Sequence, residues 1–389
     1  MKKLRVGVLF GGRSGEHEVS LLSAASVLKA INSAKYDVVP IGITKQGQWV
    51  TAVHAGHMLR GEFGQSLRAD GPQSRPPTAV LAKGEAVIVP PEPREGSLIP
   101  LESVAHGNSG QAIHVDVIFP VLHGTFGEDG TIQGLLELAD IPYVGSGVLG
   151  SAAGMDKDIM KHLFAAAGLP IVKHVTLLRS EWEKDSKTVI RKIENSLKYP
   201  VFVKPANLGS SVGISKARTS KELAPAIEMA AAYDRRIVIE EGVGRKKHKA
   251  RELECAVLGN DDPTASVVGE VVPAGEFYDY NAKYVDEGSQ LLIPAKITKK
   301  QMKTVQEMAV RAFKAVDCAG LARVDFLMDP KTEKVYANEV NTMPGFTSIS
   351  MYPKMWAASG LAYPDLIDRL IQLALERHSE KKKTRYTKG

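Results

Sequence analysis

The sequence contains few cysteines and no long hydrophobic run. Cys255 and Cys318 are the only two cysteines among 389 residues, and each lies in an apolar pattern, so we expect buried thiols and no disulfide framework. No apolar segment approaches the roughly 20 residues that span a bilayer. The apolar run at residues 4–10 is short for a secretory signal, contains Arg5 and is followed by no cleavage pattern. These absences predict a cytoplasmic protein without a membrane partner.

A strong charge of one sign and internal repeats are also lacking. The formal net charge is only +6, and part of it lies in residues 380–388. One short basic run with a single aromatic residue is a weak nucleic-acid footprint, so we expect no nucleic-acid partner. We expect residues 379–389 to form a frayed, solvated tail. The remaining composition is that of a globular protein, and the length predicts two or three domains.

The amino-terminal part has the pattern of a doubly wound α/β domain. A strand at 4–10, a glycine-rich loop at 11–18 and a helix at 19–31 form its opening. After a second strand at 36–43, residues 44–112 are rich in Pro, Gly and Ser, and we interpret them as an insertion of low functional weight with short β segments. The pattern resumes with a strand at 115–122, a helix at 131–138 and a short strand at 141–145.

Two further units follow this domain. We predict an α/β fold in three parts: an amino-terminal domain at 1–153, a central subdomain at 154–235 and a carboxy-terminal subdomain at 236–378. The expected central elements are a helix at 155–167, a strand at 201–204 and a helix at 221–233. The expected carboxy-terminal elements are strands at 236–240, 252–258 and 267–271, a helix at 299–316, a hairpin at 320–341 and a helix at 364–377.

The hairpin carries the clearest chemical signal. Side chains alternate along a strand, so Arg323 and Asp325 share one face, as do Glu339 and Asn341 on the partner strand. Burying such groups costs several kcal/mol each, by order of magnitude, unless they are paired or coordinate an ion. Carboxylate and carboxamide oxygens suit Mg²⁺ held jointly with phosphate oxygens. The alternative is a salt-bridged edge hairpin.

A second signal is a lysine followed by a loop of small residues. Lys204 ends an apolar strand, and the loop 205–213 offers glycines and serines whose backbone N–H groups can approach phosphate. The lysine precedes the glycines, so this is not a Walker A loop. Alone, the loop is equally compatible with a simple turn, and Lys157 at a helix start with an exposed lysine.

Several other residues are ambiguous when taken singly. Glu240 and Glu241 suit an adenine contact or a solvated pair, and Glu252 suits ribose hydroxyls or a pair with Arg251. Glu16 suits a substrate ammonium or a helix N-terminus. The remaining candidates are His123, which is either a ligand or a satisfied loop histidine, and Lys283-Tyr284, which is either part of a lid or a surface turn.

Taken together, the motifs resemble one family over residues 6–370. The chain is similar to the D-alanine–D-alanine ligases, which are ATP-grasp enzymes. Seven motifs in order carry the resemblance: residues 11–20, 123–134, 155–157, 204–213, 283–284, 323–325 and 339–345. The resemblance implies a three-domain ATP-grasp architecture, ATP and D-alanine as substrates, two Mg²⁺ ions with Mn²⁺ as an alternative, and a homodimer.

The resemblance also implies roles for individual residues. By this resemblance, Lys157 and Lys204 bind the phosphates of ATP. The adenine site is lined by Glu240, Glu241 and Val243, and the ribose is bound by Glu252. The metal ligands are Asp325, Glu339 and Asn341. Glu16, linked to Ser210 and Tyr284, binds the first D-alanine, and His123 lies near it. Arg323 and the backbone N–H of Gly345 stabilise the oxyanion. Lys283 binds the γ-phosphate or the second substrate, and Ser350 binds the carboxylate of the second D-alanine.

One departure and two alternatives accompany this interpretation. Residues 244–250 form a longer and more basic turn than the family has, which affects the assignments of Glu241 and Val243. An ATP-grasp ligase with D-lactate or D-serine as second substrate is the alternative within the enzyme class. A nucleotide-binding regulatory module without turnover is the alternative from another class.

Overall fold

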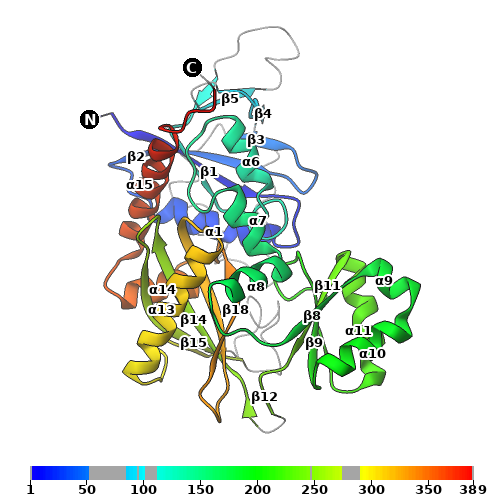
Figure 1. Ribbon diagram of the computed structural model, residues 1–389. Helices are drawn as coiled ribbons and strands as arrows, with labels where there is room; N and C mark the ends of the chain where they lie inside the picture. Colours follow the sequence, from blue (N-terminus) through cyan, green and yellow to red (C-terminus); the bar gives the residue numbers. More distant parts are fainter. Residues whose placement is uncertain are drawn as a thin grey trace, which may run out of the picture.

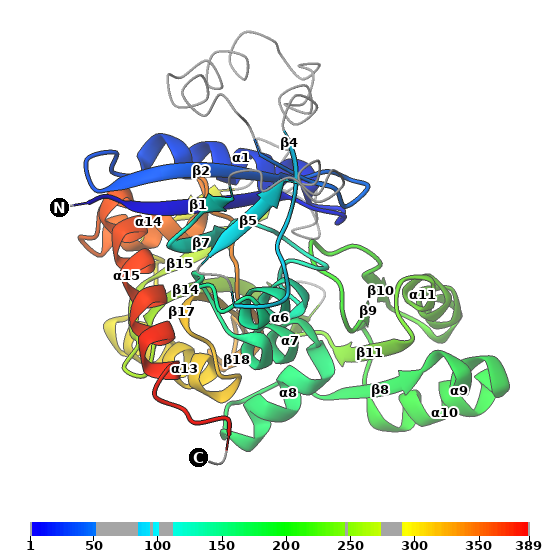
Figure 2. The ribbon, with the colours of Figure 1, turned by 90° about the horizontal axis from the view of Figure 1, so that it is seen from above.

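The computed structural model describes residues 2–51, 85–93, 96–100, 112–245, 248–273 and 290–387. These residues form an α/β fold with three larger sheets, which follow one another along the chain, and a two-stranded hairpin (Figures 1 and 2). The sheets lie in the three predicted segments, with one exception described below. The domain boundaries themselves stay a prediction.

The first sheet has the strand order β6-β5-β4-β3-β2-β1-β7. Strand β1 pairs in parallel with both β2 and β7. Its side chains alternate between two cores: Val8 and Phe10 pack with helix α1, whereas Leu9 packs with helix α6. The strands are β1 (Leu4–Gly11), β2 (Tyr36–Ile43), β3 (Trp49–Thr51), β4 (Glu85–Ile88), β5 (Ser97–Pro100), β6 (Ile113–His114) and β7 (Val117–Pro120). The helices are α1 (His17–Ala30), α6 (Thr131–Leu138) and α7 (Val148–Met155).

The described parts of the 44–112 region contain short strands, as expected, and β3, β4 and β5 extend the sheet through antiparallel pairs. Two other details of this sheet differ from the sequence prediction. The strand expected at 141–145 is a single bridge between Ile118 and Tyr143. Helix α7 was not predicted, because its Gly- and Ala-rich sequence has little hydrophobic periodicity.

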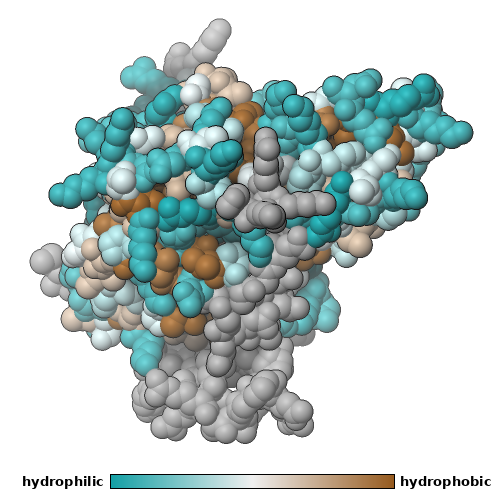
Figure 3. Space-filling view, turned by 90° about the horizontal axis from the view of Figure 1, so that it is seen from below, coloured by the Kyte–Doolittle hydropathy of each residue, from teal (hydrophilic) through white to brown (hydrophobic). Residues whose placement is uncertain are grey.

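The second sheet projects to one side of the molecule (Figure 1). It is antiparallel, in the order β10-β9-β11-β8, and helices α10 and α11 contribute to its own apolar core. Hydrophilic side chains cover most of this unit on the face seen from below (Figure 3). Its elements are β8 (His174–Leu178), α9 (Arg179–Lys184), α10 (Ser186–Ser196), β9 (Val201–Pro205), β10 (Ser215–Ala217), α11 (Ser220–Tyr233) and β11 (Arg236–Glu241).

Strand β11 belongs to this second sheet, although the sequence placed it at the start of the third segment. It pairs with both β8 and β9. Conversely, helix α8 (Lys157–Ala166), which the sequence placed in the central segment, buries Met160 and Phe164 in the core of the third unit. Helix α8 therefore ties the second unit to the third.

The third sheet has the order β16-β15-β14-β17-β18, and helix α13 covers one of its faces. Helices α14 and α15 share a core with the first sheet and with Ala256, Leu258 and Leu321 of the third. The strands are β14 (Arg251–Gly259), β15 (Thr264–Val272), β16 (Gln290–Leu292), β17 (Gly320–Met328) and β18 (Val335–Asn341). The helices are α13 (Lys299–Ala315), α14 (Met351–Ala358) and α15 (Tyr363–Lys381), and the small hairpin is β12 (Gly244–Arg245) with β13 (His248–Lys249).

The carboxy-terminal segment is more ordered than the sequence predicted. Helix α15 continues to Lys381, four residues past the predicted end at Arg377. Lys381 pairs with Glu137, and Lys382 lies 3.4 Å from a carboxylate oxygen of Asp140. The expectation of a frayed tail from residue 379 is therefore wrong for its first residues, because acidic groups at the end of α6 hold the last turn.

Phe346 joins the first and third units. Its fully buried ring lies 5.6 Å from the ring of Phe119 on β7, 6.0 Å from Tyr352 on α14 and 5.5 Å from Tyr363 on α15, centroid to centroid. The hydroxyl of Tyr363 donates to the backbone carbonyl of Phe346 at 2.6 Å. The ring therefore fixes the loop that follows β18 against three other elements.

We expect Phe346→Ala to lower the free energy of unfolding by about 3–5 kcal/mol, because it leaves a cavity among three rings. The denaturant midpoint, followed by near-UV circular dichroism, measures this loss. Phe346→Leu serves as the control, since it keeps more of the buried volume and should lose clearly less. An alanine variant with the midpoint of the parent would show that this contact does not join the units.

Candidate active site

The hairpin β17–β18 presents its polar side chains on one face, as predicted. Arg323 pairs in register with Asn341, and Asp325 with Glu339. A register shift follows Asp325, so that Phe326 is opposite Ala337 and Asn338 is the extra residue of a bulge. The bulge keeps Phe326 and Ala337 in the apolar core while Asp325 and Glu339 stay together on the other face.

The Arg323 side chain is 15% exposed and lies among carboxylates. Its Nε and Nη2 atoms each donate to Asp325 at 2.7 Å, and Nε lies 3.1 Å from Glu254 Oε2. Asn341 Nδ2 donates to Asp325 Oδ2 at 3.0 Å. Burial opposes the charged guanidinium, but Asp325 and Glu254 outweigh it and raise the pKa of Arg323 well above its usual value. The sequence analysis did not select Glu254.

The predicted phosphate lysines lie at the carboxyl end of β9 and the start of α8. Lys204 Nζ donates to Glu240 Oε2 at 2.9 Å, and Lys157 Nζ donates to the backbone carbonyl of Leu208 at 2.7 Å. Lys204 also feels the charge of Glu339 on β18, which with Glu240 raises its pKa despite burial. The loop 205–213 is thus attached to α8, and Lys204 lies within electrostatic range of Glu339, one of the predicted metal ligands.

Sequence reasoning missed Lys161, a fully buried lysine on α8. Its Nζ lies 3.1 Å from Glu240 Oε1, so Glu240 is held between two lysines. Burial favours the neutral carboxylic acid, but Lys161 and Lys204 together lower the pKa of Glu240 to about 2. Burial, reinforced by the charge of Lys204, lowers the pKa of Lys161, whereas the charges of Glu240 and Glu339 outweigh burial and raise the pKa of Lys204. The spacing Lys157-x₃-Lys161 on one helix face was the available signal.

The other residues predicted for the nucleotide border the same strands. Glu241 Oε1 accepts the backbone N–H of Lys198 at 2.8 Å, and half-buried Val243 lies two residues after the end of β11. Glu252 lies on the same face of β14 as Glu254 and contributes to the raised pKa of Lys204. Arg251 binds Glu270 on the opposite face at 2.7 and 2.6 Å, so Glu270 is its principal carboxylate partner.

Glu16 is the point where the first and second units meet. It precedes α1, yet its carboxylate makes no capping bond to that helix. Instead, Ser210 Oγ, 194 residues away, donates to Glu16 Oε1. A Cβ atom on Gly124 would lie 2.6 Å from Glu16 Oε2, and one on Gly209 would lie 3.1 Å away. Glycine at both positions lets two loops close around one buried carboxylate.

Glu128, a second residue that the sequence analysis missed, connects the loops after β7 and β18. Its carboxylate accepts the backbone N–H of Gly124 at 2.7 Å and that of Met343 at 3.2 Å. Burial, reinforced by the charge of Glu16, raises the pKa of Glu128 to about 8. Its position within a glycine-rich motif was visible, but its burial was not.

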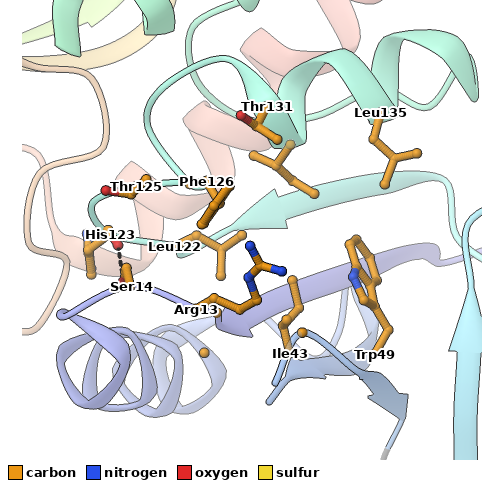
Figure 4. A pocket seen from close by; sticks show the side chains of 15 residues that line it. Arg13, Ser14, Ile43, Trp49, Leu122, His123, Thr125, Phe126, Thr131 and Leu135 are labelled. Atoms are coloured by element: carbon orange, nitrogen blue, oxygen red, sulfur yellow. Dashed lines mark hydrogen bonds between the residues drawn. The ribbon is translucent and has the colours of Figure 1, made fainter. Parts of the chain in front are cut away.

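His123 forms hydrogen bonds through both ring nitrogens. Nδ1 lies 3.0 Å from the carbonyl oxygen of Met343, and Nε2 lies 3.0 Å from Ser23 Oγ. Burial lowers the pKa of His123. Its own carbonyl accepts Ser14 Oγ at 2.7 Å, as Figure 4 shows. His123 therefore joins three segments, which favours the satisfied loop histidine over a direct ligand.

The loop after the hairpin positions the remaining predicted residues. Ser350 begins α14, and its Oγ accepts the backbone N–H of Thr347 at 3.1 Å. A Cβ atom on Gly345 would lie 3.2 Å from Ser350 Oγ, so the loop is tightly closed. Lys283 and Tyr284 lie outside the described residues.

A cavity of about 230 Å³ lies beside these loops rather than within the charged cluster. Its walls include Leu122, Phe126 and Trp49, with the Arg13 guanidinium 4.5 Å from the centroid of the Phe126 ring (Figure 4). Ser14 and His123 contribute to both places. The cavity therefore borders the candidate site, but Arg323, Lys204 and Glu240 do not line it.

Comparison with known proteins agrees with this geometry. The model of the D-ala D-ala ligase N-terminus matches residues 5–146, and that of the D-ala D-ala ligase C-terminus matches residues 163–372. A D-alanine–D-alanine ligase of Bacillus cytotoxicus is 50% identical over 387 residues, with 100% of both chains covered. One from Geobacillus kaustophilus is 49% identical, with 99% of this chain and 98% of the relative covered.

Solved structures show the same similarity. The D-alanine–D-alanine ligase from Coxiella burnetii has a TM-score of 0.80 and 35% identity, covering 98% of this chain and 97% of its own. VanG D-Ala:D-Ser ligase from Enterococcus faecalis also has a TM-score of 0.80, with 37% identity over 96% of this chain and 100% of its own. With matches that run almost from end to end in sequence and structure, the chain belongs to the D-alanine–D-alanine ligase family.

Proposed function

We propose that the protein joins two D-alanine molecules to D-alanyl-D-alanine, with conversion of ATP to ADP and phosphate. The observation that carries this proposal is the composite cluster formed by all three units. Glu339, a predicted metal ligand on β18, lies within electrostatic range of Lys204 on the second sheet. Ser210, from the loop after Lys204, binds Glu16 of the first unit. A site of this kind can bring a triphosphate, a carboxylate and an ammonium group together.

The nucleotide lies between the second and third sheets in this proposal. Lys157 and Lys204 bind its phosphates, because both reach the loop 205–213 or the strand before it. Lys161 and Glu240 hold the Lys204 ammonium in place through the buried ion pairs. Glu241 and Val243 border the adenine, and Glu252 the ribose. The contact of Glu240 with adenine that the family implies remains a prediction.

The donor set of the hairpin fits Mg²⁺. Asp325, Glu339 and Asn341 offer hard oxygen atoms on one face of the hairpin, and Glu339 lies within electrostatic range of Lys204. We assign these three residues to two Mg²⁺ ions, with Mn²⁺ as an alternative. When bound, the ions neutralise charge on the transferring phosphoryl group. Arg323 balances the charge of Asp325, and Asn341 donates a hydrogen bond to its carboxylate.

The chain's own residues then control the two substrates. Glu16 binds the ammonium of the first D-alanine, whose carboxylate attacks the γ-phosphorus of ATP, displaces ADP and becomes an acyl phosphate. The amine of the second D-alanine attacks this carbonyl, and phosphate leaves. Arg323 and the backbone N–H of Gly345 stabilise the tetrahedral oxyanion. Ser350 receives the second carboxylate, and His123 with Glu128 positions the loop beside Glu16. The lid that the resemblance implies for Lys283 and Tyr284 stays a prediction.

The family places this reaction in the synthesis of peptidoglycan precursors, and we propose that it takes place in the cytoplasm. Both cysteines are buried free thiols, which is compatible with a reducing compartment. In the part of the chain that the structure describes, no helix is both long and apolar enough to cross a bilayer. The expected homodimer stays a prediction that analytical ultracentrifugation can test.

We expect Glu339→Gln to lower kcat by at least about a hundredfold, because a metal-binding carboxylate supplies several kcal/mol at the transition state. The thermal midpoint should change little, since glutamine keeps the shape of the side chain. Glu307→Gln on the exposed face of α13 is the matched control and should retain full activity. A Glu339→Gln enzyme within about tenfold of the parent would refute the metal assignment.

The choice of second substrate is tested with equal D-alanine and D-lactate, ATP and Mg²⁺ near neutral pH. We expect D-alanyl-D-alanine to dominate, because Tyr284 in the expected lid is neutral and should admit an amine that loses its proton during attack. Product analysis by mass spectrometry distinguishes the dipeptide from the depsipeptide, and a parallel incubation with D-serine covers the activity named for VanG. A product mixture dominated by depsipeptide would overturn the lid argument. ATP binding without phosphate release would indicate the regulatory module instead.

A further inference from the structure

We propose that Asp158, His162 and His174 form a binding site for one divalent transition-metal ion of the Zn²⁺ class. The site lies at the junction between α8 and β8. It shares no residue with the predicted Mg²⁺ ligands of the hairpin β17–β18. One potential ligand atom from each of the three residues lies within 4.8 Å of the other two. Imidazole nitrogen with one carboxylate is a donor set that selects transition metals over Mg²⁺.

The local structure explains why these residues meet. Asp158 and His162 are four residues apart on α8, so they share one face of the helix. His174 is the first residue of β8, and its ring lies nearly perpendicular to that of His162, with centroids 6.0 Å apart. Ligands around tetrahedral Zn²⁺ lie about 3.3 Å apart. The His162 side chain is 68% exposed, so its ring can shift toward the other two ligands without displacing the core.

Two neighbouring contacts orient the ligands. His162 Nδ1 lies 2.7 Å from the backbone carbonyl of Asp158, so it carries the proton and leaves Nε2 as the ligand atom. Thr176 Oγ1 donates to Asp158 Oδ1 at 2.6 Å and fixes the carboxylate from the neighbouring strand. Such hydrogen bonds from outside the ligand set are typical of protein metal sites and sharpen both orientation and affinity.

The surrounding charges limit the affinity but leave room for the ion. Arg236 Nη1 lies 3.5 Å from Asp158 Oδ2, but it lies closer to Asp156, at 3.0 Å. Lys161 is also near His174, and its ammonium is paired with Glu240. The exposed side of His162 admits the ion, and water can fill the fourth coordination position.

An ion at this place would connect the second unit to the third. Helix α8 packs in the core of the third unit, whereas β8 is an edge strand of the second sheet. His174 is also the register partner of Glu240, whose carboxylate holds Lys161 and Lys204. The bound ion would therefore stabilise the folded chain beside the nucleotide site without contributing a ligand to the nucleotide.

The test uses the full-length, untagged protein in millimolar Mg²⁺, which occupies oxygen-ligand sites. Co²⁺ is titrated while visible absorption is recorded, and Zn²⁺ binding is measured by calorimetry. We expect one Co²⁺ per chain with a d–d spectrum lacking thiolate bands, because both cysteines are buried and burial raises their pKa to about 12. Zn²⁺ should raise the thermal midpoint, since it binds only the folded chain.

Three variants decide the assignment. His162→Ala, at an exposed position, should abolish the Co²⁺ spectrum and the Zn²⁺-dependent shift in thermal midpoint. Thr176→Val should weaken binding by about tenfold or more. His114→Ala removes another half-exposed histidine that faces a carboxylate, Asp116 at 2.9 Å, and should leave binding unchanged. Equal binding by the parent and His162→Ala, or no binding by the parent, would overturn the proposal.

Discussion

The structure depends on keeping a small set of buried charges paired. Arg323 lies within a five-stranded sheet, where an uncompensated guanidinium would cost several kcal/mol, by order of magnitude. Asp325 and Glu254 provide that compensation, and Asn341 completes the group. The second sheet repeats the arrangement with the opposite balance, since one carboxylate, Glu240, lies between two lysines. Both groups are therefore held in position before any substrate arrives.

The cluster on the third sheet lies within electrostatic range of the cluster on the second. The influence of Glu339 on Lys204 shows that the clusters are electrostatically coupled. A triphosphate with divalent cations carries both signs of charge, so it can replace this coupling with direct contacts to each cluster. The first unit adds Glu16, whose carboxylate is bound by Ser210 of the second. The site is complete only where all three units meet.

The hairpin was readable from the sequence because alternation alone places Arg323 and Asp325 on one face, and the loop after Lys204 was readable from its small residues. The contact between Glu16 and Ser210 spans 194 residues, and only the family resemblance suggested it. Lys161 and Glu128 were missed because a charged side chain carries no sign in the sequence that it will be buried. The extent of α15 was underestimated because its last turn depends on Glu137 and Asp140, which are distant in sequence.

The central claim is that the carboxylate of the first D-alanine attacks the γ-phosphorus of ATP within this composite site. The most direct measurement uses D-alanine labelled with ¹⁸O in its carboxylate, with ATP and Mg²⁺, followed by mass spectrometry of the released phosphate. Our account predicts that one labelled oxygen passes to phosphate for each dipeptide formed, because the acyl phosphate breaks at its carbon–oxygen bond. Dipeptide formation accompanied by unlabelled phosphate would contradict the account.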